Sequence, residues 1–235
     1  MSGGPVPGVV AEVHVWGVDR VLPALGRMAT GRRALRDVPG LRFAKLLGTG
    51  SARTFTPRDA DPHHWALLTV WDGADAADAW AASPLLRSWS ASSHEQLRVR
   101  MRPLGSRGRW SGVDPFGGAV TSSDDRWTGP VAAVTRARLR PTRALSFWRA
   151  VPPVVTDLAG SPGLRLAVGV GEAPVGLQGT FSIWDSAAAL VDFAYRRPAH
   201  RAAVEQTEPS RWYAEELFAR LAVLEVEGTY EGRTP

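Results

Sequence analysis

Cysteine is absent from the 235 residues of this chain. Its absence excludes disulfides, thiolate nucleophiles, zinc sites with cysteine ligands, iron–sulfur clusters and CxxCH haem attachment. Any metal or redox chemistry must therefore use histidine, carboxylates or a non-covalently held cofactor.

Lysine is nearly absent as well, because Lys45 is the only lysine among 28 basic residues. The arginines that supply the other positive charges favour carboxylate and phosphate partners. They are scattered among 23 acidic residues and form no basic block, and the net charge is +5. We therefore predict a mildly basic surface and no nucleic-acid partner.

Long apolar segments are also missing. No apolar run reaches the roughly 18 residues that span a bilayer. The N-terminus has neither the basic start nor the apolar core of a signal peptide. We expect a cytoplasmic protein without a stable membrane span, and no amphipathic membrane helix stands out.

Tryptophan, by contrast, is abundant, with ten in the chain. Such a number predicts broad aromatic walls that either pack together or line a flat ligand. The block with Trp65, Trp71, Trp80 and Trp89 has strand and helix spacings, so core packing is the default interpretation for most of them. The chain is long enough for one large domain or two small ones.

The first half alternates strand and helix patterns in a definite order. Ser83-Pro84 gives an N-cap followed by proline at the first helical position, which predicts that a new helix starts there. The expected order is strand, helix, strand, strand, helix, strand, which is typical of a ferredoxin-like unit. The expected strands are 11–18, 41–47, 64–71 and 97–104, and the expected helical segments are 21–36, 74–82 and 84–96.

The second half repeats this order after a segment rich in glycine, serine and aspartate. We therefore expect three parts: a ferredoxin-like repeat with a flexible leader at 1–104, a linker at 105–130, and a second ferredoxin-like repeat at 131–235. In the second repeat the expected strands are 131–140, 164–170, 180–184 and 222–228, and the expected helical segments are 141–159 and 186–220.

Matched positions support an internal duplication. Gly40-Leu41-Arg42-Phe43-Ala44 aligns with Gly163-Leu164-Arg165-Leu166-Ala167, and Trp71-Asp72 aligns with Trp184-Asp185. Each repeat leaves one apolar sheet face, which the other repeat can bury. The predicted fold class is α+β: two tandem ferredoxin-like repeats whose antiparallel sheets pack face to face as an intramolecular dimeric α+β barrel.

Among the histidines, His200 is the strongest candidate for a ligand. It follows Pro198 in a helical pattern, on a face with Ala203 and Val204, where small side chains leave room for a planar group. The alternative is a surface histidine in a first helical turn. Adjacent His63 and His64 point in opposite directions along a strand and are poor joint metal ligands.

The remaining motifs favour structural roles. His94 has a more polar setting than His200. His14 is expected to be a hydrogen-bonded structural histidine beside Trp16. Gly48-Thr49-Gly50 and Gly169-Val170-Gly171 follow strands, but no helix opens after either, so we interpret them as turn glycines and not as a dinucleotide site.

Several blocks of sequence, spread over nearly the whole chain, form a recognisable set. They are Leu41–Gly50, Arg107–Gly112, Phe147–Pro152, Gly169–Pro174, Phe181–Trp184, Phe193–His200 and Trp212–Arg220. As a set and in this order they resemble the spheroidene monooxygenase (CrtA-type) family of carotenoid ketolases. The closing 228–235 segment departs from the family pattern, since Tyr230 replaces a tryptophan.

The resemblance places the chain among haem-containing dimeric α+β barrel proteins, a group that includes chlorite dismutases, dye-decolourising peroxidases and aldoxime dehydratases. It implies a b-type haem, with His200 as the preferred axial ligand in the C-terminal repeat. The second nitrogen of His200 would then need a partner, and the acids nearby in sequence are Glu205, Glu215 and Glu216. Residues expected to bind the haem propionates are Lys45, Arg165 and Arg197.

The implied function is a haem-dependent monooxygenase-like oxidoreductase that oxygenates an apolar small molecule in carotenoid or other secondary metabolism. A ferredoxin-type protein would supply electrons, and the chain would be a monomer or homodimer. The lack of an amphipathic membrane helix favours a substrate smaller than a carotenoid. Three alternatives stay open: a haem enzyme acting on an N–O substrate, either aldoxime-dehydratase-like or nitrogen-oxidising; a cofactor-free monooxygenase of the antibiotic-biosynthesis type; and a non-catalytic haem-binding module.

Overall fold

The computed structural model describes residues 8–51, 59–117, 127–143, 146–147, 158, 160–172, 177–196 and 212–235. Most of the predicted leader at 1–10, most of the predicted helix at 141–159, and the candidate site residues Arg197, His200 and Glu205 lie outside these ranges.

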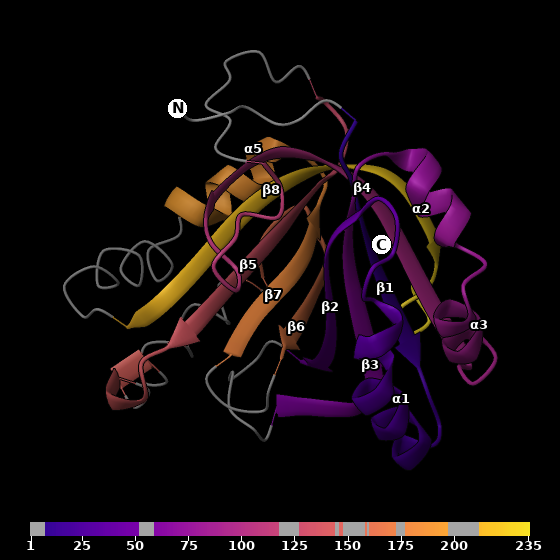
Figure 1. The fold of residues 1–235 in the computed structure, drawn as a ribbon. Helices are drawn as coiled ribbons and strands as arrows, with labels where there is room; N and C mark the ends of the chain where they lie inside the picture. The colour runs from indigo at the N-terminus through magenta and orange to yellow at the C-terminus, as the bar shows by residue number, and fades with distance from the viewer. Residues whose placement is uncertain are drawn as a thin grey trace.

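Eight antiparallel strands form a closed barrel in the order β1-β3-β2-β6-β7-β5-β8-β4 (Figure 1). This architecture confirms the predicted fold class. The two sheets are also joined by hydrogen bonds, through β2–β6 and β4–β8. The strands are β1 (Val10–Gly17), β2 (Leu41–Gly50), β3 (Ala60–Trp71), β4 (Glu95–Gly108), β5 (Val131–Leu139), β6 (Leu164–Gly171), β7 (Leu177–Trp184) and β8 (Tyr213–Gly228).

The helices lie outside the barrel (Figure 1). In the N-terminal half, Ser83 caps α3 by accepting a hydrogen bond from the Leu86 amide at 3.3 Å, with Pro84 at the first helical position, as predicted. The helices are α1 (Val21–Ala34), α2 (Ala74–Trp80), α3 (Pro84–Ser90) and α5 (Ala187–Val191), with two short turns, η2 (Pro141–Arg143) and η3 (Asp192–Arg196).

Three sequence-based predictions are wrong in detail. The helical run expected over 186–220 is a strand from Tyr213 onward, because β8 pairs with β4 on one side and β5 on the other. The helix expected to reach Gln96 ends at Ser90, and β4 begins at Glu95. Strand β4 also continues to Gly108, into the segment expected to be a linker.

The glycines expected in turns lie within strands instead. Gly48 pairs with Gly171, and Gly50 pairs with Gly169, across the β2–β6 seam between the two repeats. Residues from distant parts of the chain thus meet here.

Matched contacts show that the two halves are structural repeats. The indole N–H of Trp71 donates to Thr69 Oγ1 at 2.9 Å, and that of Trp184 donates to Ser182 Oγ at 2.9 Å. The Arg42 guanidinium binds Asp72, as the Arg165 guanidinium binds Asp185. The two arginine–aspartate pairs tie the start of the second strand to the end of the third strand in each repeat.

Side chains that alternate along all eight strands fill the barrel interior. Inward positions on β1 are Ala11, Val13 and Val15, and those on β8 are Leu217, Ala219 and Leu221. The core also contains Trp110 and Tyr230, which are buried at equivalent places after β4 and β8. Because successive strand residues point to opposite faces, the remaining positions face outward toward the helices.

Candidate functional site

The outer sheet face of the N-terminal half is filled by large side chains. The rings of Trp16 and Trp89 stack with their centroids 5.1 Å apart, and His14 stacks on Trp16 at 5.6 Å. Trp65, Leu46 and Leu67 pack in the same cluster, beneath α1 and α3. Stacked aromatic rings therefore occupy the layer between sheet and helices in this half.

A buried carboxylate, Glu12, joins side chains of two neighbouring strands on the same face. Glu12 accepts hydrogen bonds from Arg98 and Arg100 at 3.2 and 2.9 Å and lies 3.4 Å from His14. Burial alone would raise the pKa of Glu12, but the contacts with His14, Arg100 and Arg98 outweigh it and lower the pKa to about 2. His14 is thus held by a hydrogen bond, as predicted.

The equivalent face of the C-terminal half is made of small side chains. The correspondence between the halves follows from strand register. Val10 pairs with Trp71 in the N-terminal half, and Val131 pairs with Trp184 in the C-terminal half. In the same way, Leu46 pairs with Leu67, and Gly169 pairs with Thr180. Small residues stand at the positions of larger ones as follows: Ala133 for Glu12, Thr135 for His14, Ala137 for Trp16, Gly169 for Leu46 and Thr180 for Leu67.

These small residues come from three adjacent strands, β6, β7 and β5, and so form one continuous surface. Thr135 and Thr180 hydrogen-bond to each other through their hydroxyl groups at 2.6 Å, which keeps both side chains flat against the sheet. At one end the surface is bounded by a small apolar cluster that includes Trp184 and Phe193, whose rings stack at 5.2 Å. A planar group can approach this backbone more closely than it can approach the N-terminal sheet.

A second group of polar residues lies at one end of the barrel, on the inward side. Arg136 is buried and binds both Glu215 and Glu172, while Lys45 binds Glu172 at 2.8 Å. The Trp110 indole N–H donates to Glu172 at 2.7 Å. We call these five residues the arginine cluster.

The arginine cluster holds the 108–113 hairpin against β8. Glu215 accepts hydrogen bonds from the Ser111 and Gly112 amides at 3.0 and 2.8 Å. Gly108 begins this hairpin at φ 90°, where a Cβ atom would lie 2.1 Å from the Glu216 carbonyl oxygen. Burial would raise the pKa of Glu215, but the two amides and Arg136 outweigh it and lower the pKa.

Glu172 behaves in the same way. Burial opposes its ionisation, yet Lys45, Trp110 and Arg136 together lower its pKa. Both carboxylates of the cluster are therefore ionised near neutral pH, and each is balanced by a cation.

The opposite hairpin, at 228–233, is held by an equivalent arrangement with different chemistry. Glu95 accepts hydrogen bonds from the Glu231 and Gly232 amides at 2.9 and 2.7 Å. The basic side chain beside it is His64, which lies 3.4 Å from Glu95 and 2.6 Å from Asp61. We call His64, Asp61 and Glu95 the histidine cluster.

Hydrogen bonding to Asp61 is the main cause that raises the pKa of His64, against the effect of burial, and Glu95 adds to it. Within the described ranges, no group of three or more histidine, aspartate or glutamate side chains is arranged to hold a metal ion. The raised pKa favours the protonated form of His64, in which it can pair with both carboxylates.

The predicted propionate partners lie apart from one another. Lys45 is bound to Glu172 and Ser111 in the arginine cluster, on the inward side of β2. Arg165 lies at the start of β6, where it binds Asp185 at 2.6 Å. Arg197 and His200 fall outside the described residues, so their roles stay predictions.

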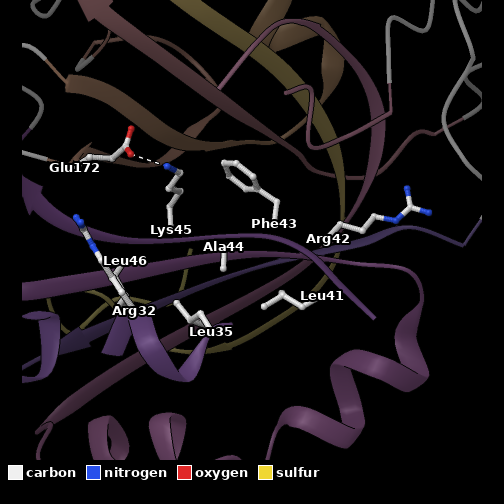
Figure 2. A pocket seen from close by; sticks show the side chains of 9 residues that line it. All are labelled: Arg32, Leu35, Leu41, Arg42, Phe43, Ala44, Lys45, Leu46 and Glu172. Carbon is white, nitrogen blue, oxygen red and sulfur yellow. Dashed lines mark hydrogen bonds and ion pairs between the residues drawn. The ribbon is translucent and has the colours of Figure 1, made fainter. Parts of the chain in front are cut away.

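A pocket of about 340 Å³ opens along β2, near Lys45 and Glu172 (Figure 2). Arg32 and Leu35, from α1 and the turn after it, line one side, and Phe43 and Glu172 lie on the other side of β2. All its lining residues except Glu172 belong to the N-terminal half, and none is part of the small-residue surface of β5, β6 and β7.

Sequence reasoning missed both hairpin clusters and the small-residue surface. Glu215 was considered only as an acid near His200, because β8 was predicted to be helical. Arg220 was not considered, yet it pairs opposite Ala133, so its position on β8 is next to the small-residue surface. The repeated glycines at 108 and 228 were the available signal for the two hairpins.

Known proteins are similar to this chain in sequence or in fold, although no family model matches it. Spheroidene monooxygenase of Rhodobacter capsulatus is 36% identical over 215 residues, which cover 90% of this chain and 87% of that protein. Spheroidene monooxygenase of Rubrivivax gelatinosus is 36% identical over 226 residues, covering 96% and 82%. Among solved structures, aldoxime dehydratase (OxdRE) in complex with butyraldoxime has a TM-score of 0.58 at 13% identity, covering 97% of this chain and 85% of that one.

Two ferredoxin-like repeats closed into one barrel, with helices outside, define a dimeric α+β barrel protein. The two relatives add the identification at the level of sequence: the chain belongs to the spheroidene monooxygenase family. It is accordingly an enzyme, an oxidoreductase of the monooxygenase type.

Proposed function

We propose that this protein is a haem-dependent monooxygenase that oxygenates a carotenoid or a similar apolar polyene, with a b-type haem against the outer face of β5, β6 and β7. The observation that carries the proposal is the small-residue surface of Ala133, Thr135, Ala137, Gly169 and Thr180. The equivalent surface of the other half is covered by stacked tryptophans.

The described residues of the small-residue surface fit a planar cofactor such as haem. Alanine, glycine and threonine side chains let a flat macrocycle contact the sheet over a wide area, which favours binding by dispersion and by removal of apolar surface from water. A bound haem supplies the activation of O₂, a reaction that also needs an external reductant, such as a ferredoxin-type protein.

The chain itself would supply a ligand for the haem iron and partners for the propionates. Since cysteine is absent, His200 is the proposed ligand, and its position in the C-terminal repeat agrees with the half that has the small-residue surface. Proposed propionate partners are Arg197, Arg165 and Lys45, and we add Arg220 because of its position beside Ala133. Lys45 and Arg165 already bind Glu172 and Asp185, so each would have to exchange its partner.

Spectroscopy of the purified protein tests the proposal. We expect a Soret band after addition of haem, and we expect His200→Ala to shift or remove it while His94→Ala leaves it unchanged. A Soret band that His200→Ala does not alter would contradict the ligand assignment.

Turnover distinguishes monooxygenation from the open alternatives. We expect oxidation of a carotenoid substrate to need both O₂ and a reductant. Conversion of an aldoxime without net electron supply would favour the dehydratase alternative, and carotenoid oxidation by haem-free protein would favour a cofactor-free enzyme.

A further inference from the structure

Helix α1 exposes leucine side chains to solvent. Leu22 is 80% exposed, which is the largest exposed fraction among the large apolar side chains that the structure describes, and Leu25 is 46% exposed. Both lie in the first two turns of α1, a helix on the outside of the barrel (Figure 1). Burial of such side chains would be favourable, so this face suits an apolar contact.

The opposite side of α1 is firmly attached to the protein. Ala24 and Gly31 are its buried residues. A Cβ atom at Gly31 would lie 2.8 Å from Leu46 and 3.1 Å from Leu85, which shows how closely the helix approaches the sheet and α3. The exposed leucines therefore stand on a fixed helix, and local rearrangement does not bury them.

Positive charge follows the leucines along the same helix face. At 100° per residue, Leu22, Leu25, Ala29, Arg32 and Arg33 fall within one stripe of roughly 100°. Arg32 and Arg33, in the last turn, are exposed, and neither has an ion pair within the described part of the chain.

The charge of this region is of one sign. Residues 20–36 contain five arginines and no acidic residue. The nearest acids in sequence flank the segment: Asp19 lies 3.1 Å from His94, and Asp37 follows the helix. Glu172, which lines the pocket with Arg32, is already paired with Lys45 and Arg136. Apolar residues followed by arginines on one exposed helix face match a surface with an apolar interior and anionic head groups.

The pocket along β2 begins beside the basic end of this helix. Its lining combines apolar and charged side chains, namely Arg32, Leu35, Leu41, Arg42, Phe43, Ala44, Lys45, Leu46 and Glu172. A surface docked on α1 would therefore lie next to an opening with both apolar and charged side chains (Figure 2).

We propose that the exposed face of α1 docks on an anionic lipid bilayer, with Leu22 and Leu25 at the boundary of the acyl chains and Arg32 and Arg33 on lipid phosphates. This inference goes beyond the proposed function and does not depend on it. It differs from the expectation, based on sequence pattern alone, that no amphipathic membrane helix stands out. Within the described residues, no helix combines the length and apolar character needed to cross a bilayer, so the contact is peripheral.

Co-sedimentation with vesicles tests this docking. Wild-type protein should bind to vesicles of phosphatidylcholine mixed with phosphatidylserine. It should bind far less to vesicles of phosphatidylcholine alone. Arg32→Gln/Arg33→Gln should lower the partition coefficient on anionic vesicles by about fivefold for each arginine removed. Leu22→Glu/Leu25→Glu should lower it by at least about tenfold.

Matched controls use residues of the same type elsewhere on the surface. Leu224→Glu alters a leucine that is 47% exposed on β8, and Arg143→Gln/Arg233→Gln removes two exposed arginines. Neither control should change vesicle binding. Circular dichroism should show the same fold for every variant, since all substituted side chains are exposed.

Three outcomes would overturn the proposal: wild-type protein that does not bind anionic vesicles, α1 variants that bind as wild type does, or controls that lose binding equally. A dimer that Leu22→Glu/Leu25→Glu converts to a monomer, without vesicle binding, would assign this face to a second copy of the chain. Haem content and oxidation of detergent-dissolved substrate are measured on the same samples, so a failure of the proposed function is seen separately.

Discussion

The two halves of the molecule share one fold and differ in what lies between sheet and helices. In the N-terminal half, Trp16 and Trp89 stack in this layer, and Glu12 is held by two arginines. In the C-terminal half, alanine, glycine and threonine occupy the matching strand positions. The N-terminal repeat fills this layer with its own side chains, whereas under the proposed function the C-terminal repeat would present its small-residue surface to a cofactor.

The hairpin clusters differ in a second way. Arg136 carries a permanent charge at the hairpin 108–113, whereas His64 carries a titratable charge at the hairpin 228–233. The same backbone device, a glutamate that binds two hairpin amides, thus has a cation that titrates near neutral pH at the 228–233 hairpin and a cation that does not titrate at the 108–113 hairpin.

The largest effect should come from the buried arginine. Arg136→Met leaves Glu172 and Glu215 without their shared cation, and we expect the free energy of unfolding to fall by about 3–5 kcal/mol. Urea denaturation followed by tryptophan fluorescence measures it. Arg165→Met, which removes a partly exposed pair, is the control and should cost about 1 kcal/mol or less; equal losses would contradict the special role of Arg136.

Removing the hairpin glutamates should have a smaller effect. Glu95→Gln keeps a carbonyl acceptor but loses the charge, so we expect a loss of about 1–3 kcal/mol in unfolding free energy. Hydrogen exchange should become faster at the amides of residues 231 and 232 and stay unchanged at 111 and 112. Glu215→Gln should show the reverse pattern, and faster exchange at both hairpins in either variant would argue against two independent clusters.

The pH dependence separates the two clusters further. The pKa of His64 is raised in the folded protein, so its contribution to the free energy of unfolding is fully present below the unfolded pKa of 6.5. That contribution is lost as pH rises through the folded pKa. The pKa values of Glu172 and Glu215 are lowered in the folded protein. Their contribution to the free energy of unfolding is therefore fully present above the unfolded value of 4.5 and is lost as pH falls through the folded pKa values.

Denaturation midpoints between about pH 6 and 9 should therefore decline in wild-type protein and decline less in His64→Gln. His63→Gln is the control and should follow the wild-type curve. A His64→Gln curve parallel to wild type would show that this histidine does not couple protonation to folding.

The smallest effect is expected at the mirrored anchor pairs. Arg42 and Asp72 in one half match Arg165 and Asp185 in the other, and all four side chains are about a third exposed or more. Arg42→Gln and Arg165→Gln should each cost about 0–1 kcal/mol, and by similar amounts. A loss of haem affinity in Arg165→Gln alone would assign Arg165 to the propionates.

Local pattern predicted much of the fold, because each repeat contains strong signals such as Trp71-Asp72, Ser83-Pro84 and the alternation in β4. It failed at β8, where Ala, Glu, Leu and Arg favour a helix locally but pairing with β4 and β5 makes a strand. The period-two spacing of Leu217, Ala219 and Leu221 was the signal that should have outweighed propensity.

The site was less predictable for a different reason. Gly169, Thr180 and Ala137 come from three strands, and their shared surface is visible only once strand register is known. Arg136 and Glu215 are likewise 79 residues apart in sequence. Single residue types suggested His200, but the surface that a cofactor would contact depends on tertiary pairing.

The most direct test of the asymmetry is haem titration of Ala137→Trp, which places in the C-terminal half the side chain that Trp16 provides in the N-terminal half. We predict that this variant keeps the wild-type circular dichroism spectrum and loses haem binding at least about tenfold, as a buried indole would occupy the cofactor's contact surface. The control Ala81→Trp, at an exposed position after α2, should bind haem as wild type does. A folded Ala137→Trp protein with an unchanged Soret titration would contradict the account.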